Sequence, residues 1–138
     1  MKVGLEEVEF VVTIDSWSEF YQPGYAIVLD QDVVTTTAEM TRGQVYCEKF
    51  SRWIAPGRHQ LKVRLLAPGG QSQITIGSIK INGAELELVN HGQYNLDRPR
   101  LYNGSTVSSI RKITTLGWSG EYVIEFLSPT VIWFLTDF

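Results

Sequence analysis

The histidines are the first residues to consider for chemistry, because a serine or cysteine nucleophile needs a base beside it. The sequence contains two histidines, His59 and His91, and no Gly-x-Ser-x-Gly motif. His59 alternates in phase with Leu61 and Val63, which is typical of a packed or turn-capping histidine. His91 lies in a turn-like Asn-His-Gly sequence, where it could bind a ligand or serve the turn alone. No nucleophile and base stand out together, so we expect a protein that is not an enzyme.

Metal ligands are sparse. Cys47 is the single cysteine, and one cysteine with two distant histidines cannot complete a zinc site without carboxylates. Calcium prefers several carboxylate oxygens, and Asp30, Asp32 and Glu39 are the nearest cluster, around a turn. Aspartate is also common in turns because its side chain hydrogen-bonds to the local backbone. We therefore expect no metal and no cofactor.

Aromatic side chains are the stronger candidates for binding. The segment DSWSEFYQPGY contains Trp17, Tyr21 and Tyr25 between two strand-like runs, and Trp118 lies in the sequence LGWSG. Exposed Trp and Tyr rings offer flat surfaces to a sugar or to a partner protein, although the same rings can fold inward and cap the end of a β-sandwich. Under the first alternative, one exposed patch binds protein or glycan and is lined by Trp17, Tyr21, Tyr25, His91 and Trp118.

The elements that would position these residues are strands. Apolar and polar residues alternate with period two, for example at Val8, Phe10, Val12 and Ile14, which indicates half-buried strands. No stretch keeps a helical period over three turns. The pattern predicts strands at about 8–15, 25–29, 44–53, 61–65, 74–81, 84–89, 121–127 and 130–138.

Turn signals divide these strands. Gly77 interrupts the alternation of its strand and predicts a β-bulge, and Asn82-Gly83 predicts a two-residue hairpin turn. Pro129 cannot donate to a ladder, so it belongs at a turn or at a strand start. The pattern weakens between about 90 and 116, where we expect a long loop. Trp53 and Trp133 alternate within strands and are expected in the core.

These patterns predict one all-β domain spanning residues 1–138, a single antiparallel β-sandwich of jelly-roll type. The formal net charge is -3, which argues against binding nucleic acid by bulk charge. The basic residues between 98 and 112 are expected to lie on a solvated loop. We also expect no signal peptide and no membrane insertion, because no apolar run approaches the ~20 residues of a membrane helix.

The order of several motifs resembles that of known proteins. A strand with the sequence GRHQLKVRL precedes a hairpin with the sequence ITIGSIKING, and the chain closes on Phe126, Ser128, Pro129, Trp133 and Phe134. This order resembles small β-sandwich proteins of tailed bacteriophages, over most of the chain except 91–116. The resemblance implies a virion protein, either a head decoration or a tail or fibre component, present in many copies. Such a protein would be assembled in the host cytoplasm and would dock on capsid or tail proteins.

The first part of the chain also resembles calcium-dependent xylan-binding modules. In those modules the hairpin region contributes aspartates, whereas this sequence has Gln71, Ser72 and Gln73. We therefore expect a related shape without the calcium site. The sequence leaves two hypotheses: a structural or accessory virion protein that acts by protein–protein docking, and, as the alternative, a glycan-binding module for adsorption to a host surface.

Overall fold

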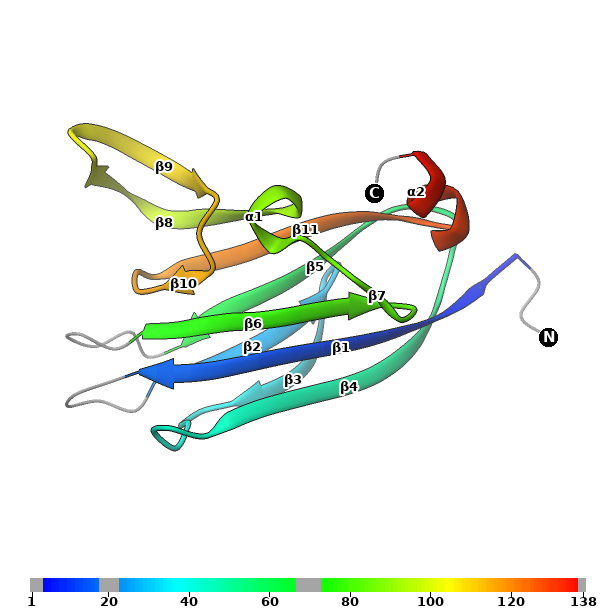
Figure 1. Cartoon of the computed structure of the whole chain (residues 1–138), viewed down its shortest axis with the longest axis horizontal. Helices are drawn as coiled ribbons and strands as arrows, with labels where there is room; N and C mark the ends of the chain where they lie inside the picture. The colour runs from blue at the N-terminus through cyan, green and yellow to red at the C-terminus, as the bar shows by residue number, and fades with distance from the viewer. Residues whose placement is uncertain (1–3, 18–22, 67–72, 137–138) are drawn as a thin grey trace.

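The computed structural model describes residues 4–17, 23–66 and 73–136, which form two antiparallel sheets packed against each other (Figure 1). The first sheet has five strands in the order β10–β6–β1–β4, with β7 paired to β6, and the second has six in the order β3–β2–β5–β11–β8–β9. The all-β sandwich predicted from the alternation is confirmed.

The first sheet consists of β1 (Glu6–Trp17), β4 (Val45–Ile54), β6 (Gln73–Ile81), β7 (Ala84–Glu85) and β10 (Thr115–Leu116). The second sheet consists of β2 (Gly24–Leu29), β3 (Asp32–Thr37), β5 (Gly57–Leu66), β8 (Gly92–Tyr102), β9 (Ser105–Arg111) and β11 (Gly120–Ser128). Two short helices complete the described chain, α1 (Leu88–His91) and α2 (Thr130–Thr136). Neither helix in these ranges has the length and apolar character needed to cross a bilayer.

The core lies between the two sheets. Val8, Phe10, Val12 and Ile14 of β1 are fully buried, as their shared phase predicts. They meet alternate residues of the second sheet, among them Val63 of β5 and residues of β11. Each fully buried side chain of this size contributes about 1.5–3 kcal/mol of hydrophobic free energy. The period-two pattern therefore defines one continuous core.

The two turn signals of β6 are confirmed. The pairing of β1 with β6 shifts between Thr13 and Ile14, so that Gly77 is left without a partner as a β-bulge. Asn82 and Gly83 both adopt positive φ, at 49° and 80°, and close the hairpin to β7. The partner strand is shorter than predicted, because it ends at Glu85 and α1 follows.

The long loop predicted at about 90–116 is wrong: this segment forms the end of α1 and the strands β8, β9 and β10. The alternation is hidden because four residues, 96–99, face a single residue of β9 in an irregular bulge that includes Pro99. Beyond the bulge, the hairpin tip projects from the body of the molecule (Figure 1). Asn103 and Gly104, with φ of 50° and 82°, form the turn of the β8–β9 hairpin. This Asn-Gly sequence is the same turn signal that predicted the β6–β7 hairpin.

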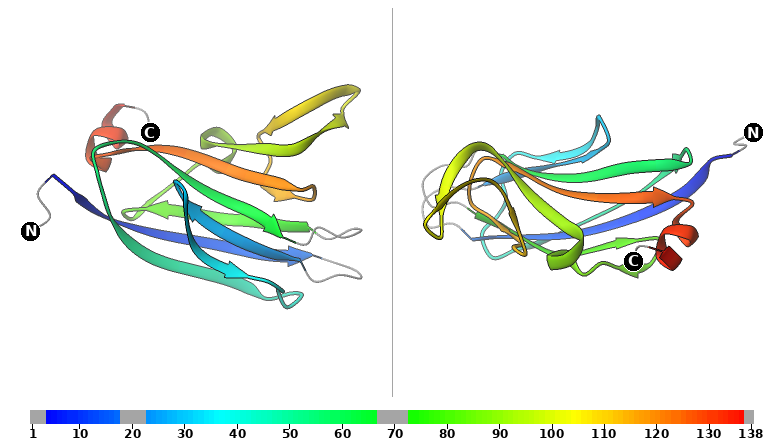
Figure 2. Two further views of the ribbon diagram at one scale, coloured as in Figure 1. Left: turned by 180° about the vertical axis from the view of Figure 1, so that it is seen from behind. Right: turned by 90° about the horizontal axis from the view of Figure 1, so that it is seen from above.

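The strand predicted at 130–138 is also wrong, because residues 130–136 form α2. The β-branched and aromatic sequence TVIWFLT favours a strand by propensity, but Thr130 and Trp133 share a buried side at helical spacing. Viewed from above, α2 lies at the end of the sandwich where β11 finishes (Figure 2). Trp133 is in the core as predicted, whereas Trp53, also expected there, is 45% exposed.

Candidate functional site

The structure does not bring the five predicted aromatic and histidine residues together as one exposed patch. Trp17 ends β1 with its side chain outside the described residues, and Tyr21 also lies outside them. Tyr25 is fully buried, and its hydroxyl donates to the carboxylate of Glu48. Burial and this hydrogen bond raise the pKa of Tyr25 to about 12. A ring in this position packs the core and cannot stack on a ligand.

Trp118 is half-buried at the base of the β8–β9 hairpin. Its backbone N–H donates to the hydroxyl of Tyr94 at 2.9 Å, and that hydroxyl donates to the Trp118 carbonyl. The Arg100 guanidinium lies over the indole at 5.6 Å from the ring centroid, and Tyr102 approaches it edge-on at 6.5 Å. Trp118 is therefore held by its own neighbours in the hairpin.

His91 lies where α1 passes into β8, and its ring nitrogen Nδ1 is 3.0 Å from the carbonyl oxygen of Glu87. Because a carbonyl only accepts, Nδ1 carries the proton. The ring edge also packs against Trp133, with the two centroids 6.1 Å apart. These contacts orient the imidazole between two adjoining hollows of the surface.

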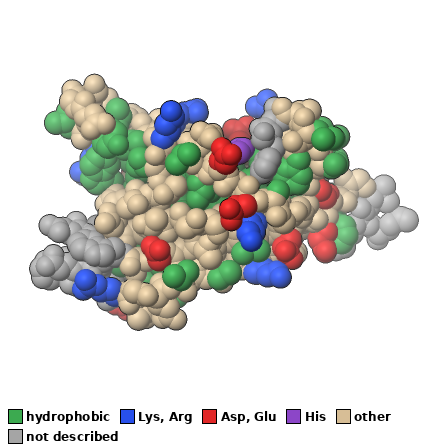
Figure 3. All heavy atoms as spheres, in the orientation of Figure 1, with side chains coloured by type: hydrophobic (Ala, Val, Ile, Leu, Met, Phe, Trp, Pro, Cys, Tyr) green, Lys and Arg blue, Asp and Glu red, His purple; other side chains and the backbone are tan. Residues whose placement is uncertain are grey.

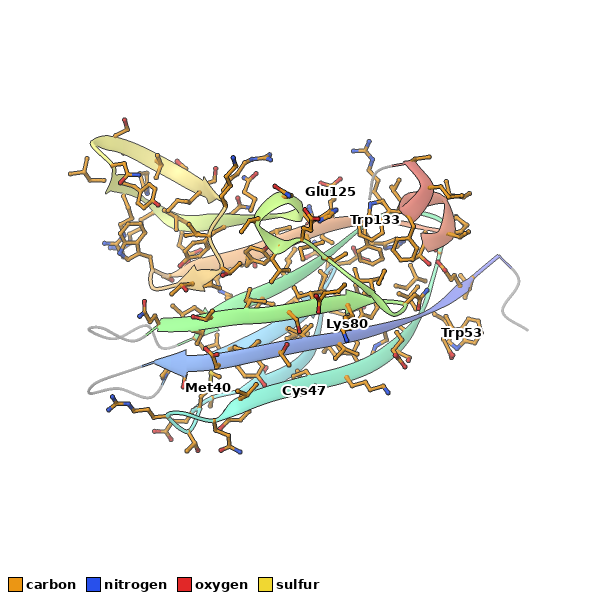
Figure 4. All side chains as sticks on the ribbon, viewed as in Figure 1. Met40, Cys47, Trp53, Lys80, Glu125 and Trp133 are labelled. Atoms are coloured by element: carbon orange, nitrogen blue, oxygen red, sulfur yellow. The ribbon has the colours of Figure 1, made fainter. Side chains whose placement is uncertain are left out.

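We call these two hollows together the sheet-face groove. The first has a volume of about 320 Å³ and is lined mainly by Arg58, Asn90, His91, Glu125 and Trp133. The second, of about 250 Å³, is lined mainly by Gln60, His91, Gln93, Asn95, Arg111 and Glu125. His91 and Glu125 belong to both hollows. Glu125 on β11 and Trp133 on α2 lie near each other along the upper side of the molecule (Figure 4).

The groove runs over the outer face of the second sheet. Gln60 of β5 pairs with Glu125 of β11, and Gln93 of β8 pairs with Arg111 of β9, so these side chains project to one side of adjacent strands. Gln93 Nε2 donates to Asn95 Oδ1 at 2.7 Å, which sets the orientation of both amides. The result is a row of neutral donors and acceptors on a rigid sheet.

Charged pairs border the groove. Arg58 lies 3.4 Å from Glu125, in an exposed pair of small energetic weight. Arg64 pairs with Asp97 and lies 3.7 Å from Glu121. A hydrogen bond from Ser119, with the Arg64 guanidinium beside it, outweighs burial and holds the pKa of Asp97 below its usual range. These pairs neutralise most of the carboxylates around the groove.

Of the five sequence-based candidates, His91 lines the groove. The other groove residues, among them Gln60, Gln93 and Glu125, were not sequence-based candidates. Gln60 carried a signal, because it alternates with Leu61 and Val63 and so must face outward. Gln93 fell in the segment expected to be a loop. Nothing in the sequence indicated that Glu125 would share a hollow with His91, because that contact depends on how α1 and β11 pack.

Among the described residues, no three His, Cys, Asp or Glu side chains lie together as possible metal ligands. Asp30 instead accepts from the backbone N–H of Gln60 at 2.9 Å and lies 2.7 Å from His59 Nδ1. His59 Nε2 in turn lies 2.7 Å from the carbonyl oxygen of Ala55. This histidine therefore supports the turn, as its phase predicts. Gln71 and Ser72, which stand where xylan-binding modules carry aspartates, lie outside the described residues.

Neither a family model nor a curated protein matches the sequence. Two solved structures have a similar fold. One is vCBM60 in its selenomethionine form, described in connection with circular permutation between two families of calcium-dependent carbohydrate-binding modules. The TM-score is 0.61 and the sequence identity is 15%, and the match covers 85% of this chain and 89% of the vCBM60 chain. The other is vCBM60 in complex with galactobiose, with a TM-score of 0.60 at 14% identity, over 84% of this chain and 96% of that one. At this identity the likeness establishes the fold: the chain is a β-sandwich similar to calcium-dependent carbohydrate-binding modules.

Proposed function

We propose that this protein is a non-catalytic module that binds a glycan through the sheet-face groove. The observation that carries the proposal is the convergence of three amides, Gln60, Gln93 and Asn95, with His91 and Glu125 on the outer face of one sheet. Sugar hydroxyls both donate and accept hydrogen bonds, and so do amide side chains. The fold likeness to carbohydrate-binding modules supports the same function.

The placement of these groups on paired strands favours binding. A site held by a sheet loses little conformational entropy when a ligand arrives, so its hydrogen bonds contribute more of their energy to affinity. Trp133 is among the residues that line the first hollow, and Val123 among those that line the second, so each hollow has an apolar side chain beside its polar ones. A groove lined by both kinds of side chain suits a chain of sugar rings, which have apolar faces and polar hydroxyls.

Binding is tested with a glycan array on the full chain, followed by titration calorimetry with the glycans that bind. Replacing an amide removes hydrogen bonds to hydroxyls, so Gln93→Ala is expected to weaken binding about tenfold, which corresponds to about 1.4 kcal/mol. Gln44→Ala is the matched control, because Gln44 is exposed on the loop before β4 and away from the groove. Equal losses in both variants, or no glycan bound by the unaltered chain, would contradict the proposal.

Binding without turnover is part of the proposal. Glu125 is the carboxylate that both hollows share, and Arg58 pairs with it. A glycosidase needs a second carboxylate facing the first across the bond that breaks. Prolonged incubation with a bound glycan is expected to release no new reducing ends. Release that disappears in Glu125→Gln would show hydrolysis and overturn this part.

A second candidate function is docking on other virion proteins, in the head or in the tail and fibre apparatus. It is favoured by the apolar surface of α2, where Val131, Ile132 and Leu135 are exposed. Hydrophobic side chains gather at this end of the molecule in Figure 3. A contiguous apolar surface of this kind is typical of protein contacts, and many copies on a particle would let each contact be weak.

Docking is tested by mass spectrometry of purified phage particles from the source. Hundreds of copies would indicate head decoration, whereas small multiples of a tail symmetry would indicate a tail or fibre position. Leu135→Asp is expected to remove the chain from particles without unfolding it, because Leu135 is 82% exposed. Absence of the chain from particles would rule out the docking function and leave glycan binding as the proposal.

A further inference from the structure

A row of four residues crosses the outer face of the second sheet. Lys62 of β5 pairs with Val123 of β11, Val123 pairs with Gln93 of β8, and Gln93 pairs with Arg111 of β9. Directly paired residues project to the same face. Their sequence neighbours, such as Val63 and Ile124, are fully buried, so this row faces outward. Adjacent strands are about 4.8 Å apart, which separates the two ends of the row by about 14 Å.

The two ends of this row are cations, and neither has a carboxylate partner among the described residues. The other cations of the face are engaged, since Arg58 pairs with Glu125 and Arg64 with Asp97 and Glu121. The side chains of Lys62 and Arg111 form no ion pair or hydrogen bond within residues 4–17, 23–66 and 73–136. The face thus has an unbalanced positive charge, although the chain as a whole has a net charge of -3.

Arg111 is the cation that reaches the groove. It lines the second hollow together with Gln60, Gln93 and Asn95. Arg98 and Arg100 lie on β8 of the same hairpin, and Lys112 directly follows β9; none of the three lines the second hollow. A chain of sugar rings in the second hollow would place one ring beside a guanidinium that has no side-chain partner in the described part of the chain.

We propose that the sheet-face groove selects a glycan that bears carboxylates, with a uronic acid residue in the second hollow and its carboxylate on Arg111. This inference rests on the proposed function, since it names the class of glycan for the same groove. A guanidinium offers a planar pair of N–H donors that matches a carboxylate, and such charge-assisted hydrogen bonds are about twice as strong as neutral ones. Lys62, at the opposite end of the row, adds a second attraction for a chain with repeated carboxylates.

The carboxylate of Glu125 does not oppose this arrangement. Glu125 lies two strands away from Arg111 across the sheet and two residues along β11 from Val123, which belongs to the same row as Arg111. These offsets correspond to a separation of about 12 Å. Exposed charges separated by more than about 8 Å are largely screened at physiological ionic strength. Arg58 also balances the charge of Glu125 directly. The Glu125 carboxylate can therefore accept hydrogen bonds from sugar hydroxyls while the Arg111 guanidinium binds the glycan carboxylate.

The test uses pairs of glycans that differ only in charge. Polygalacturonate, alginate and hyaluronan are each compared with their methyl-esterified or carboxyl-reduced forms, by titration calorimetry on the full chain. At least one acidic glycan is expected to bind about tenfold more tightly than its neutral form, and the preference is expected to weaken with salt. Arg111→Gln is expected to abolish the preference, because it weakens binding of the acidic form about tenfold more than binding of the neutral form.

The matched control is Lys112→Gln, which removes one positive charge from the next position of the chain but outside the groove. It is expected to keep the preference, so loss in both variants would assign the effect to overall charge and overturn the inference. Equal binding of dextran sulfate would overturn the choice of a carboxylate. Equal binding of acidic and neutral forms overturns the inference but leaves glycan binding intact. Binding of no glycan at all overturns the proposed function itself.

Discussion

Glu6 connects the two ends of the described chain at the scale of single residues. Its carboxylate accepts hydrogen bonds from Ser128 Oγ at 2.7 Å, from the backbone N–H of Thr130 at 2.9 Å and from Thr130 Oγ1 at 2.6 Å. Asn82, in the turn after β6, donates to both Glu6 and Thr130. One side chain at the start of β1 therefore holds the beginning of α2, the helix that replaces the predicted final strand.

Replacing Glu6 with glutamine is expected to lower the free energy of unfolding by about 1–2 kcal/mol, because an acceptor of several hydrogen bonds is lost. Burial disfavours the charged form of Glu6, but the hydrogen bonds from Thr130 and Ser128 outweigh it and hold its pKa below the usual value. Because the pKa of Glu6 is lower in the folded state, its ionised form stabilises the fold at pH values above the pKa in the unfolded chain, which is about 4.3. This stabilisation is lost as the pH falls through the pKa of Glu6 in the folded protein. The difference in the free energy of unfolding between Glu6→Gln and the unaltered chain should thus shrink as the pH falls from roughly 6 to roughly 3, which is the window set by these pKa values.

Urea unfolding at several pH values measures this difference. Glu7→Gln is the matched control, since Glu7 is exposed on the same strand and its side chain has no hydrogen bond or ion pair among the described residues. A difference between Glu6→Gln and the unaltered chain that stays constant with pH would contradict the linkage. An equal loss in Glu7→Gln would show that general charge, not the contact with α2, is responsible.

At the scale of elements, β8 depends on close contact with β11. A Cβ atom at Gly120, the first residue of β11, would overlap the carbonyl oxygen of Asn95 on β8. A backbone oxygen cannot move aside without breaking the pairing of the two strands. β8 supplies Gln93 and Asn95 to the groove, so this glycine positions the site through the sheet.

Gly120→Ala is therefore expected to lower the free energy of unfolding by about 2 kcal/mol and to weaken glycan binding with it. Gly117→Ala is the matched control, because a Cβ there has its nearest neighbour at 3.9 Å, an ordinary contact. Thermal unfolding monitored by circular dichroism measures stability, and calorimetry with the glycan identified on the array measures binding. Equal stability and equal glycan affinity of the two variants would show that neither property requires the close approach of β8 to β11.

At the scale of the whole molecule, stability is not uniform. β1 pairs on both sides, with β4 and β6, and β5 pairs on both sides, with β2 and β11. β9 is an edge strand that pairs with β8 alone, and the bulge at 96–99 separates its outer half from the sheet. The apolar core lies under β1 and β5, while most of β9 is exposed. Local opening should therefore begin at the hairpin tip.

Native-state hydrogen exchange is expected to protect the central amides of β1 and β5 more than about tenfold better than those of residues 105–107 in β9. Binding of a glycan in the groove should slow exchange at residues 92–95 and 109–111, which border the second hollow, and leave β4 unchanged. Uniform exchange over both sheets would contradict this distribution. Slowing that is confined to α2 would place the ligand on the apolar surface instead of the groove.

The alternation of apolar and polar residues was enough to predict the fold class and the inward face of most strands. Period two makes every second residue of a strand face the same way, so the buried positions of β1 and β5 could be read directly, as could the bulge at Gly77 and the turn at Asn82-Gly83. The same rule placed Gln60 on the outer face. Local chemistry was sufficient because each of these features depends on a few neighbouring residues.

The positions of α2, β8 and β9, and the set of residues that form the groove, depend on contacts between segments that are distant in the sequence. The sequence of α2 favours a strand, but packing of Trp133 against Phe126 and the hydrogen bonds that Thr130 donates to Glu6 favour the helix. The bulge at 96–99 hid the alternation of β8, and with it the amide of Gln93. Groove residues come from β5, α1, β8, β9, β11 and α2. Strands that are distant in the sequence become neighbours only through pairing across the sheet. A site assembled from such long-range contacts leaves no periodic signal in any one segment. The sequence therefore predicted an aromatic binding patch, and the groove became visible only in the folded structure.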